Sequence, residues 1–178
     1  MKTFRKIMHL VPIMLFWLMM TVFFWSWIFT FLTDAPREEK IVLFVECDVP
    51  DATYIAAKLE EVPSEVIRLA QVRPFSYSMM SSEDIRSSDL YIVSESGFQE
   101  YSEWFMPLPE NALNLGESFL FENKPYGVKV YDAQTKSGIL TDFIGYEDEN
   151  YYLAFGNQSL HIENGEAVSH ADQLFNIQ

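Results

Sequence analysis

The longest apolar stretch of the chain lies near its start. The run from Val11 to Leu32, "VPIMLFWLMMTVFFWSWIFTFL", contains no charged residue. Lys2, Arg5 and Lys6 precede it, and the polar segment "TDAPREEK" follows it. Its length matches the roughly 20 apolar residues that a helix needs to cross the hydrocarbon core of a bilayer. Basic residues before a span favour a cytoplasmic N-terminus, so the rest of the chain is expected outside the cell membrane. The sequence therefore predicts a short basic N-terminus (1–10), a transmembrane helix (11–33), a linker (34–40) and an extracytoplasmic domain (41–178).

A cleaved secretory signal is the alternative interpretation of this run. Such signals have an apolar region of about 7–15 residues and end in small residues of the A-x-A kind. The segment "FTFLTDAPREE" contains no such pattern, and no cysteine follows the run closely enough for lipid attachment. An uncleaved, single-pass anchor in the cell membrane fits the sequence better.

The pattern after the linker alternates between strands and helices. "KIVLFVECDVP", "VIRLAQVRPF" and "LYIV" are short apolar runs of the kind that form buried parallel strands. Helical spacing follows each of them, in "PDATYIAAKLEEV" with Asp51 as N-cap, in "SSEDIRSSD" opened by Ser81, and in "GFQEYSEWF" capped by Ser96. The last segment places Phe98, Tyr101 and Phe105 on one stripe. This order predicts an α/β fold with a mostly parallel sheet and crossover helices.

The second half of the domain has a different pattern. "SFLFENKPYGVKVYD" predicts two strands joined around Glu122–Lys124, "GILTDFIGY" and "YYLAFG" are further strand candidates, and Glu166–Phe175 is a candidate closing helix. The region is rich in aromatic residues, namely Tyr126, Tyr131, Tyr151, Tyr152 and Phe155. We expect most of them in the core of a small sheet. The alternative is a stacking surface for a sugar or a partner protein.

Charge and cysteine content narrow the classes of partner. All 26 acidic residues and nine of the 12 basic ones follow Thr33, so this part has a net charge of −17. Nucleic acid and anionic lipid headgroups are poor partners for it, because both require basic patches. Cys47 is the only cysteine, which excludes an intramolecular disulfide and a cysteine-based zinc site. We expect Cys47 to be a small apolar residue at a strand end, with a reactive thiol as the alternative.

No motif predicts catalysis. Ser94 and Ser96 lack the glycine spacing of a hydrolase elbow. The histidines of the domain, His161 and His170, lie far from these serines in the sequence. Their mutual spacing of nine residues matches no metal-ligand pair, and we expect both to face solvent. Asn157-Gln-Ser159 matches the glycosylation sequon, a short pattern that often arises by chance. No Gly-rich phosphate loop occurs, and we predict neither a metal site nor a cofactor.

The order of several segments resembles the N-terminal lobe of bacterial extracellular solute-binding proteins, which serve ABC transporters and have a type 2 periplasmic-binding fold. The segments are "SSDLYIVS", "WFMPLPENA", "ENKPYGVKVYD" and "YYLAFGNQSLHI", within residues 40–162. Two features depart from that family: Lys129 stands where it usually has proline, and the chain ends where a second lobe would begin. The resemblance implies a single, truncated and membrane-anchored lobe.

The resemblance also implies where a ligand would bind. In open α/β sheets the crevice lies beyond the carboxyl ends of the strands. That edge would hold Cys47, Asp48, Arg73, Phe75, Ser94, Glu95 and Ser96, and the hairpin would add Tyr126.

Three functions are compatible with this interpretation. The first is a non-catalytic binding domain, an accessory to a membrane transport complex, which contacts a membrane protein or a second copy of itself. The second is a single-lobe receptor for a small solute such as a sugar. The third is an enzyme with an unrecognised site.

Overall fold

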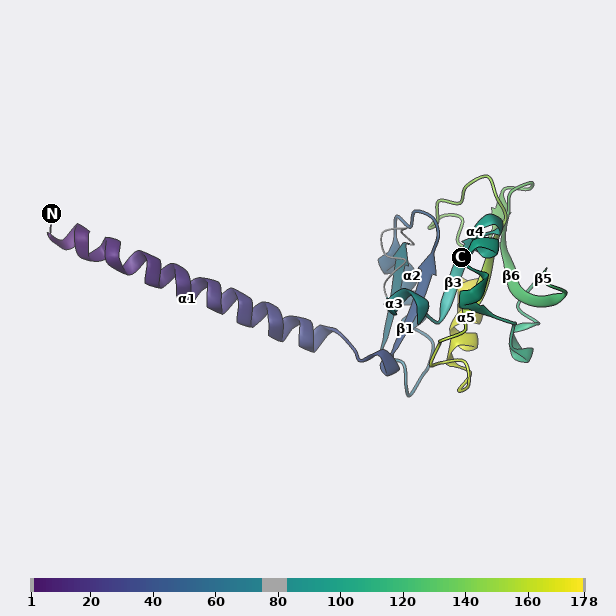
Figure 1. Cartoon of the computed structure of the whole chain (residues 1–178), viewed down its shortest axis with the longest axis horizontal. Helices are drawn as coiled ribbons and strands as arrows, with labels where there is room; N and C mark the ends of the chain where they lie inside the picture. The colour runs from purple at the N-terminus through teal and green to yellow at the C-terminus, as the bar shows by residue number, and fades with distance from the viewer. Residues whose placement is uncertain (1, 75–82, 178) are drawn as a thin grey trace. The chain divides into compact units, whose positions relative to one another are not determined.

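The computed structural model describes residues 2–74 and 83–177, which form two compact units on either side of the Pro36–Arg37 bond (Figure 1). The first unit is helix α1 (Lys2–Thr33) with the three residues that follow it. Its segment Val11–Thr30 has a mean hydropathy of 1.8, and none of it is buried. The hydroxyl groups of Thr21 and Thr30 donate to backbone carbonyl groups one turn earlier, which satisfies them within an apolar helix. The helix is long and apolar enough to cross a membrane, a property that anchors and signal sequences share.

The second unit begins with the predicted alternation of strands and helices. Strand β1 (Lys40–Val45) pairs in parallel with β2 (Leu69–Pro74) and β3 (Leu90–Ser94). Between them lie α2 (Ala52–Glu60) and the single turn α3 (Glu83–Arg86). Asp51 caps α2 as predicted, because its Oδ1 accepts from the Tyr54 backbone N–H at 3.0 Å. Ser81 lies outside the described residues.

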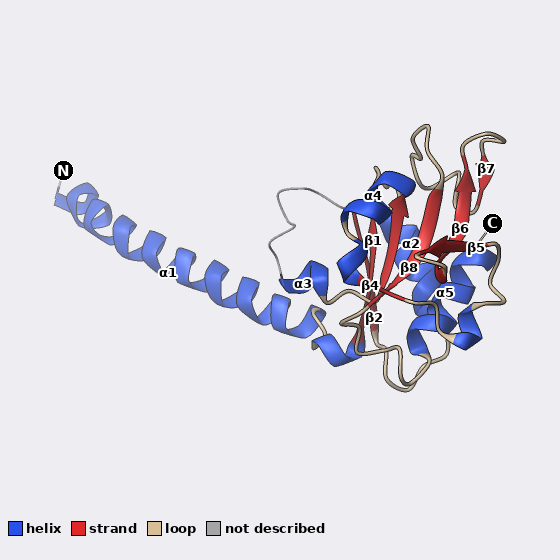
Figure 2. Cartoon of the chain, turned by 45° about the vertical axis from the view of Figure 1, so that its right-hand side comes forward, coloured by secondary structure: helices blue, strands red, loops and turns tan. Residues whose placement is uncertain are grey.

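The remaining strands make the sheet mixed. Strand β8 (Tyr151–Gly156) runs antiparallel between β3 and β6 (Lys124–Asp132), and β5 (Ser118–Phe121) pairs with β6 as the predicted hairpin. The turn residues Glu122 and Asn123 have φ values of 50° and 63°, as a two-residue hairpin turn requires. The strand order is β2-β1-β3-β8-β6-β5, with the two-residue strands β4 (Phe105–Met106) on β8 and β7 (Ser137–Gly138) on β6 (Figure 2).

Two local predictions were wrong. The segment "GILTDFIGY" contributes only Gly138 to a strand, and the chain then turns at Leu140, where φ is 57°. The cap of α4 (Glu95–Glu100) is Ser94, not Ser96, because the Ser94 hydroxyl accepts from the Gly97 N–H at 3.0 Å. The strand therefore passes into the helix with no intervening loop.

The sheet has a core on each face. On one face, α2 and α5 (Glu166–Asn176) cover aliphatic side chains of β1, β3 and β8. On the other, Phe98 of α4 packs against Phe105, Phe119 and Tyr152, with ring centroids 4.8 to 6.4 Å apart. Phe98, Tyr101 and Phe105 are all buried, although α4 ends at Glu100 and a 3-10 turn (Ser102–Trp104) carries the chain on to β4.

The histidines and aromatic residues of the second half are mostly interior. His161 and His170 are 2% and 1% exposed, so the prediction that they face solvent was wrong. One nitrogen of each ring has a backbone carbonyl group as a partner, which compensates in part for the burial of the ring. Tyr151, Tyr152 and Phe155 are buried as predicted, and Tyr126 and Tyr131 are half-buried.

Candidate functional site

The carboxyl ends of β1, β2, β3 and β6 lie at one edge of the sheet, where β8 begins. This edge holds Asp48, which is exposed, and the segment Ser94–Ser96. Arg73, near the end of β2, is half-buried and donates to Gln71 Oε1 at 2.7 Å. Phe75 lies outside the described residues.

Tyr126 does not join this group. The neighbouring Gly127 aligns across β8 with the first half of β3, so Tyr126 lies toward the opposite end of the sheet from Ser94. There its ring packs against Phe98 and Phe121. The structure thus places the candidate ligand-binding residues that follow β1 and β3 at one edge of the sheet. Tyr126, the candidate in the hairpin, lies away from them.

Glu46, which follows β1, forms hydrogen bonds with the end of β3 and the start of α4. Its Oε2 accepts from the Ser94 backbone N–H at 2.6 Å, and its own backbone N–H donates to Ile92 O at 2.8 Å. A Cβ atom on Gly97 would lie 2.3 Å from the same Oε2. The glycine is therefore needed for the close approach of this carboxylate to the helix.

Glu149 accepts hydrogen bonds from the first turn of α4. One carboxylate oxygen, Oε2, accepts from the backbone N–H of Ser96 at 3.2 Å and from its hydroxyl at 2.7 Å. The hydroxyl groups of Ser94 and Ser96 are 3.1 Å apart. Donors that would face an anionic ligand at this junction are thus taken by a carboxylate of the chain itself.

Glu95 and Asn150 fasten the start of β8 to the same turn. The Glu95 backbone N–H donates to Asn150 O at 3.0 Å, and Asn150 Nδ2 donates to Glu95 Oε2 at 3.3 Å. Tyr152 donates its hydroxyl to the same Oε2 at 3.4 Å, and Asn150 Oδ1 accepts from the Ala133 N–H at 3.1 Å. Both polar ends of the Asn150 side chain are satisfied inside the protein.

Burial and like charge determine the electrostatics of the edge. Burial raises the pKa of Glu46, Ser94 hydrogen bonds oppose the shift, and the charges of Glu149 and Glu100 add to it. Burial likewise raises the pKa of Cys47 to about 12. The Cys47 side chain is 8% exposed, so the structure favours the packing role over the reactive thiol.

A shallow hollow of about 430 Å³ remains at the edge. Most of its lining residues are polar and three are carboxylates, although their aliphatic stems expose about as much apolar surface as polar. The lining consists of Glu95, Ser96, Gln99, Ala133, Gln134, Asp148, Glu149 and Asn150. Four large hydrophobic side chains of the second unit are described as exposed, namely Val66, Leu113, Leu120 and Leu160, and none of them lines this hollow. The crevice edge that the resemblance implied is therefore lined mostly by polar residues and lacks these exposed hydrophobic side chains.

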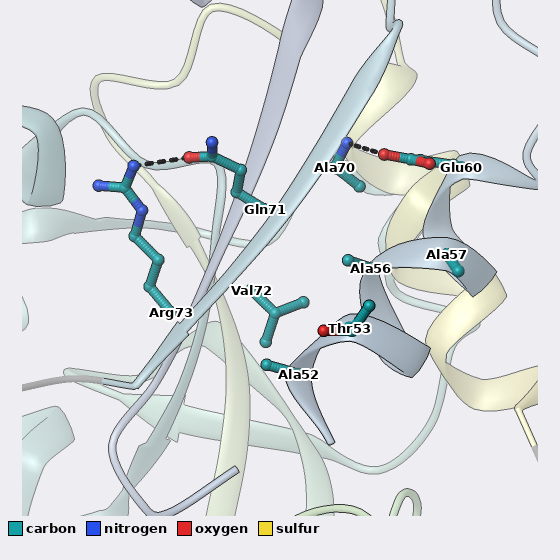
Figure 3. Close-up of a pocket in the computed structure, with 9 residues that line it drawn as sticks. All are labelled: Ala52, Thr53, Ala56, Ala57, Glu60, Ala70, Gln71, Val72 and Arg73. Atoms are coloured by element: carbon teal, nitrogen blue, oxygen red, sulfur yellow. Dashed lines mark hydrogen bonds between the residues drawn. The ribbon is translucent and has the colours of Figure 1, made fainter. Parts of the chain in front are cut away.

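A second hollow of about 450 Å³ lies between α2 and β2 (Figure 3). Alanine side chains of α2 form one wall, and Val72 lies on the strand side. Glu60 Oε1 accepts from the Ala70 backbone N–H at 3.1 Å, and Pro74 has no N–H to offer. These two features reduce the hydrogen bonds that the edge of β2 can offer to another strand.

The described residues of the edge do not form a catalytic constellation. Ser94 and Ser96 are engaged as described, and no histidine accompanies them. His161 contacts the backbone of Arg37, before β1, and interacts electrostatically with Asp89, before β3. It lies at the opposite end of these strands. Within residues 2–74 and 83–177, no group of three His, Cys, Asp or Glu side chains could hold a metal ion.

Comparison with protein-family models, curated proteins and solved structures found no match to this chain. The interpretation of the site therefore depends on its geometry.

Sequence reasoning missed Glu46, Glu149 and Asn150. Glu46 has a local signal, since it directly follows a buried strand. The roles of Glu149 and Asn150 depend on β8 inserting next to β3, which no pattern in the sequence indicates.

Proposed function

We propose that the chain is a membrane-anchored protein whose α/β unit binds a partner and catalyses no reaction. In this proposal α1 is an uncleaved anchor, its N-terminus is cytoplasmic, and residues 37–178 lie outside the membrane. The unit derives from a lobe of a solute-binding protein and serves as an accessory to a membrane transport complex. Three parallel strands with connecting helices, followed by an antiparallel return strand, are compatible with that origin.

One observation carries the proposal: the ligand edge of the sheet is occupied by the chain's own carboxylates. Glu46 and Glu149 take the Ser94 and Ser96 donors that a small anionic solute would need. The remaining hollow is open and is lined mostly by charged and amide residues, whereas sites for small molecules are usually concave and lined mostly by hydrophobic and aromatic side chains. A partner protein can use such a surface without displacing these contacts.

A photo-crosslinking residue placed in the hollow tests the proposal in native membranes. The positions are Gln99 and Gln134, which line the hollow, and the control position is the exposed Glu65. We expect one defined membrane-protein adduct, or an adduct to a second copy, from both hollow positions and none from the control. Alkaline extraction of the membranes and external protease treatment test the anchor and the orientation.

The single-lobe receptor makes the opposite prediction. In that case no adduct forms, and some small solute raises the Tm of the chain. Absence of adducts from both hollow positions would therefore overturn the partner proposal, whether or not a solute is found.

A further inference from the structure

Strand β5 is one of the two outer strands of the sheet and pairs with β6 alone. Just before β5, the Glu117 carbonyl oxygen accepts from the Lys129 N–H of β6 at 2.8 Å. Backbone groups of successive residues in an antiparallel pair point alternately toward and away from the partner strand. The register shift after Phe119 adds its extra residue to β6, so this alternation continues along β5. The N–H and C=O groups of Ser118 and Leu120 therefore point away from β6, where the described residues form no further strand.

The edge of β5 is more open to another strand than the edge of β2. Leu120 is 64% exposed, the highest value among the exposed large hydrophobic side chains described in the second unit. β5 contains neither proline nor lysine, which commonly protect edge strands, and only its length of four residues limits pairing. At β2, by contrast, Glu60 accepts from the Ala70 N–H and Pro74 has no N–H. An edge such as that of β5 is suited to the addition of a strand.

We propose that two copies of the chain pair in antiparallel orientation through β5, so that their sheets become continuous across a two-fold axis at Phe119. In this register Ser118 of each copy faces Leu120 of the other. Both residues point their backbone groups outward, so the two symmetric pairs exchange about four hydrogen bonds. A register that pairs Leu120 with itself would place Ser118 opposite Glu122, which belongs to the hairpin turn, and would lose part of this exchange.

Side chains on both faces of the sheet favour the same register. The Phe119 ring packs on Tyr152 with the centroids 4.2 Å apart. The two Phe119 rings of the dimer meet in the closely spaced type of cross-strand pair, which suits aromatic side chains. On the opposite face, the two Leu120 side chains lie diagonally across the axis, within reach of each other. The pairing thus covers the most exposed hydrophobic side chain of the second unit.

Charge complementarity identifies a second copy as the partner of this edge. The register places Glu117 of one copy opposite Phe121 of the other, and Phe121 pairs with Lys124 in its own hairpin. Glu117 and the Lys124 of the other copy therefore lie in one row on the same face, with Cα atoms about 10 Å apart. Both residues are exposed, and their side chains are long enough to meet over Phe121. An ion pair then forms on each side of the axis.

The twist of the sheet makes the dimer compatible with two anchors in one membrane. β5 lies four strands from β1 in the sheet, and a twist of about 20–25° per strand accumulates to roughly 90°. Figure 2 shows β5 lying across the direction of β1. The two-fold axis, perpendicular to the sheet at β5, is thus nearly parallel to β1, and the amino ends of both β1 strands point the same way. This step rests on the proposed anchor, whereas the pairing itself does not.

Cysteine crosslinking of the full chain in intact cells tests the register. In a Cys47→Ala background, copies with Ser118→Cys and copies with Leu120→Cys carry tags of different size, are produced together and are oxidised. Facing Cα atoms lie about 5.5 Å apart, within disulfide range, whereas diagonal ones lie about 7–8 Å apart. We expect at least about threefold more dimer of the two different copies than of either copy with itself. Val66→Cys, at an exposed position outside β5, is the control for random collision.

An exchange of charges between the copies tests the row of Glu117 and Lys124. Glu117→Lys in the Ser118→Cys copy should reduce crosslinking about threefold, because two lysines then face each other. Lys124→Glu in the Leu120→Cys copy should restore the yield. The same Lys124→Glu change in the Ser118→Cys copy should not restore it, because the new carboxylate faces the Glu117 of the other copy.

A yield from the mixed copies no higher than that from Val66→Cys overturns the pairing. Equal yields from mixed and identical copies overturn the register, as does an equal effect of Lys124→Glu in either copy. Crosslinking that Glu117→Lys leaves unchanged also contradicts the register. Alkaline extraction tests the anchor separately, so failure of the pairing can be told from failure of the proposed function.

Discussion

Gly97→Ala tests whether Glu46 is held in place between β1 and α4. The new Cβ would lie 2.3 Å from Glu46 Oε2, closer than the 3.0 Å that real Cβ contacts respect. The carboxylate must therefore move and give up its 2.6 Å bond with the Ser94 N–H. Ser94 is 6% exposed, so its N–H would lose its acceptor in a nearly dry position.

Two opposing effects determine the size of the change. Loss of a hydrogen bond to a charged group costs about 1.5–3 kcal/mol. We expect a cost at the lower end of this range, because Glu46 is half-exposed and water can solvate its carboxylate. Alanine is favoured over glycine in a helix by about 1 kcal/mol. The free energy of unfolding should thus fall by roughly 0.5 kcal/mol, which lowers the Tm by about 2 °C for a unit of this size.

Thermal and urea unfolding of residues 37–178, a compact unit on its own, measure this change. In a Glu46→Ala background the clash is absent, and Gly97→Ala should stabilise the unit by up to about 1 kcal/mol. Gly145→Ala is the matched control, because its Cβ would meet no atom closer than 3.6 Å. The same effect of Gly97→Ala with and without the Glu46 side chain would refute the reasoning.

Three further predictions concern the same edge of the sheet. Burial and the charge of Glu149 raise the pKa of Glu46 in the folded state, so ionisation of Glu46 opposes folding as pH rises. The urea midpoint of Glu46→Gln should therefore be higher than that of the wild type at pH 7. The two midpoints should become equal near pH 4, where Glu46 is protonated in both the folded and the unfolded state. Ser94→Ala should cost about 1 kcal/mol in thermal unfolding and Ser96→Ala less, and the reverse order would contradict the assigned cap. Burial raises the pKa of Cys47 from 9.0 to about 12, so a maleimide should label the native chain at pH 7.5 about 1000-fold more slowly than the urea-unfolded chain. Equal rates would contradict the burial of Cys47.

The first half of the unit could be predicted from the sequence because its signals are local. A continuous apolar run such as "KIVLFV" indicates a strand buried on both faces, and Asp51 marks the start of the next helix. The hairpin turn at Glu122 and Asn123 is equally local. In each case the residues that specify the element are adjacent in sequence, so no knowledge of the tertiary structure is required.

The errors occurred where tertiary contacts decide between local alternatives. Ser94 and Ser96 both satisfy the preference for a small polar cap, and the cap was assigned to the residue with Gln99 three positions later. In the structure Ser96 bonds to Glu149, which is 53 residues away, and Ser94 is left to cap the helix. The histidines show the same limit: a polar residue in a polar segment suggests exposure, but His161 is buried because Arg37, 124 residues away, supplies a carbonyl group for its ring.

The position of β8 links these errors to the character of the site. By entering the sheet antiparallel beside β3, β8 places its first residues and the preceding Glu149 at the carboxyl ends of the parallel strands. A parallel strand in that place would have brought its carboxyl end and the following loop to the edge instead. The antiparallel insertion therefore explains both why Ser96 bonds to Glu149 and why the ligand edge is closed by the chain's own side chains. It also makes the two ends of the sheet distinct, since the loop that leaves β8 carries Ser159 and His161 to the amino ends of β1 and β3. The residues on either side of β8 make the contacts at the two ends of the sheet, so a change that shifts the register of β8 should disturb the Glu149 and His161 contacts together. Gly97→Ala and His161→Gln should each affect the contacts at one end alone.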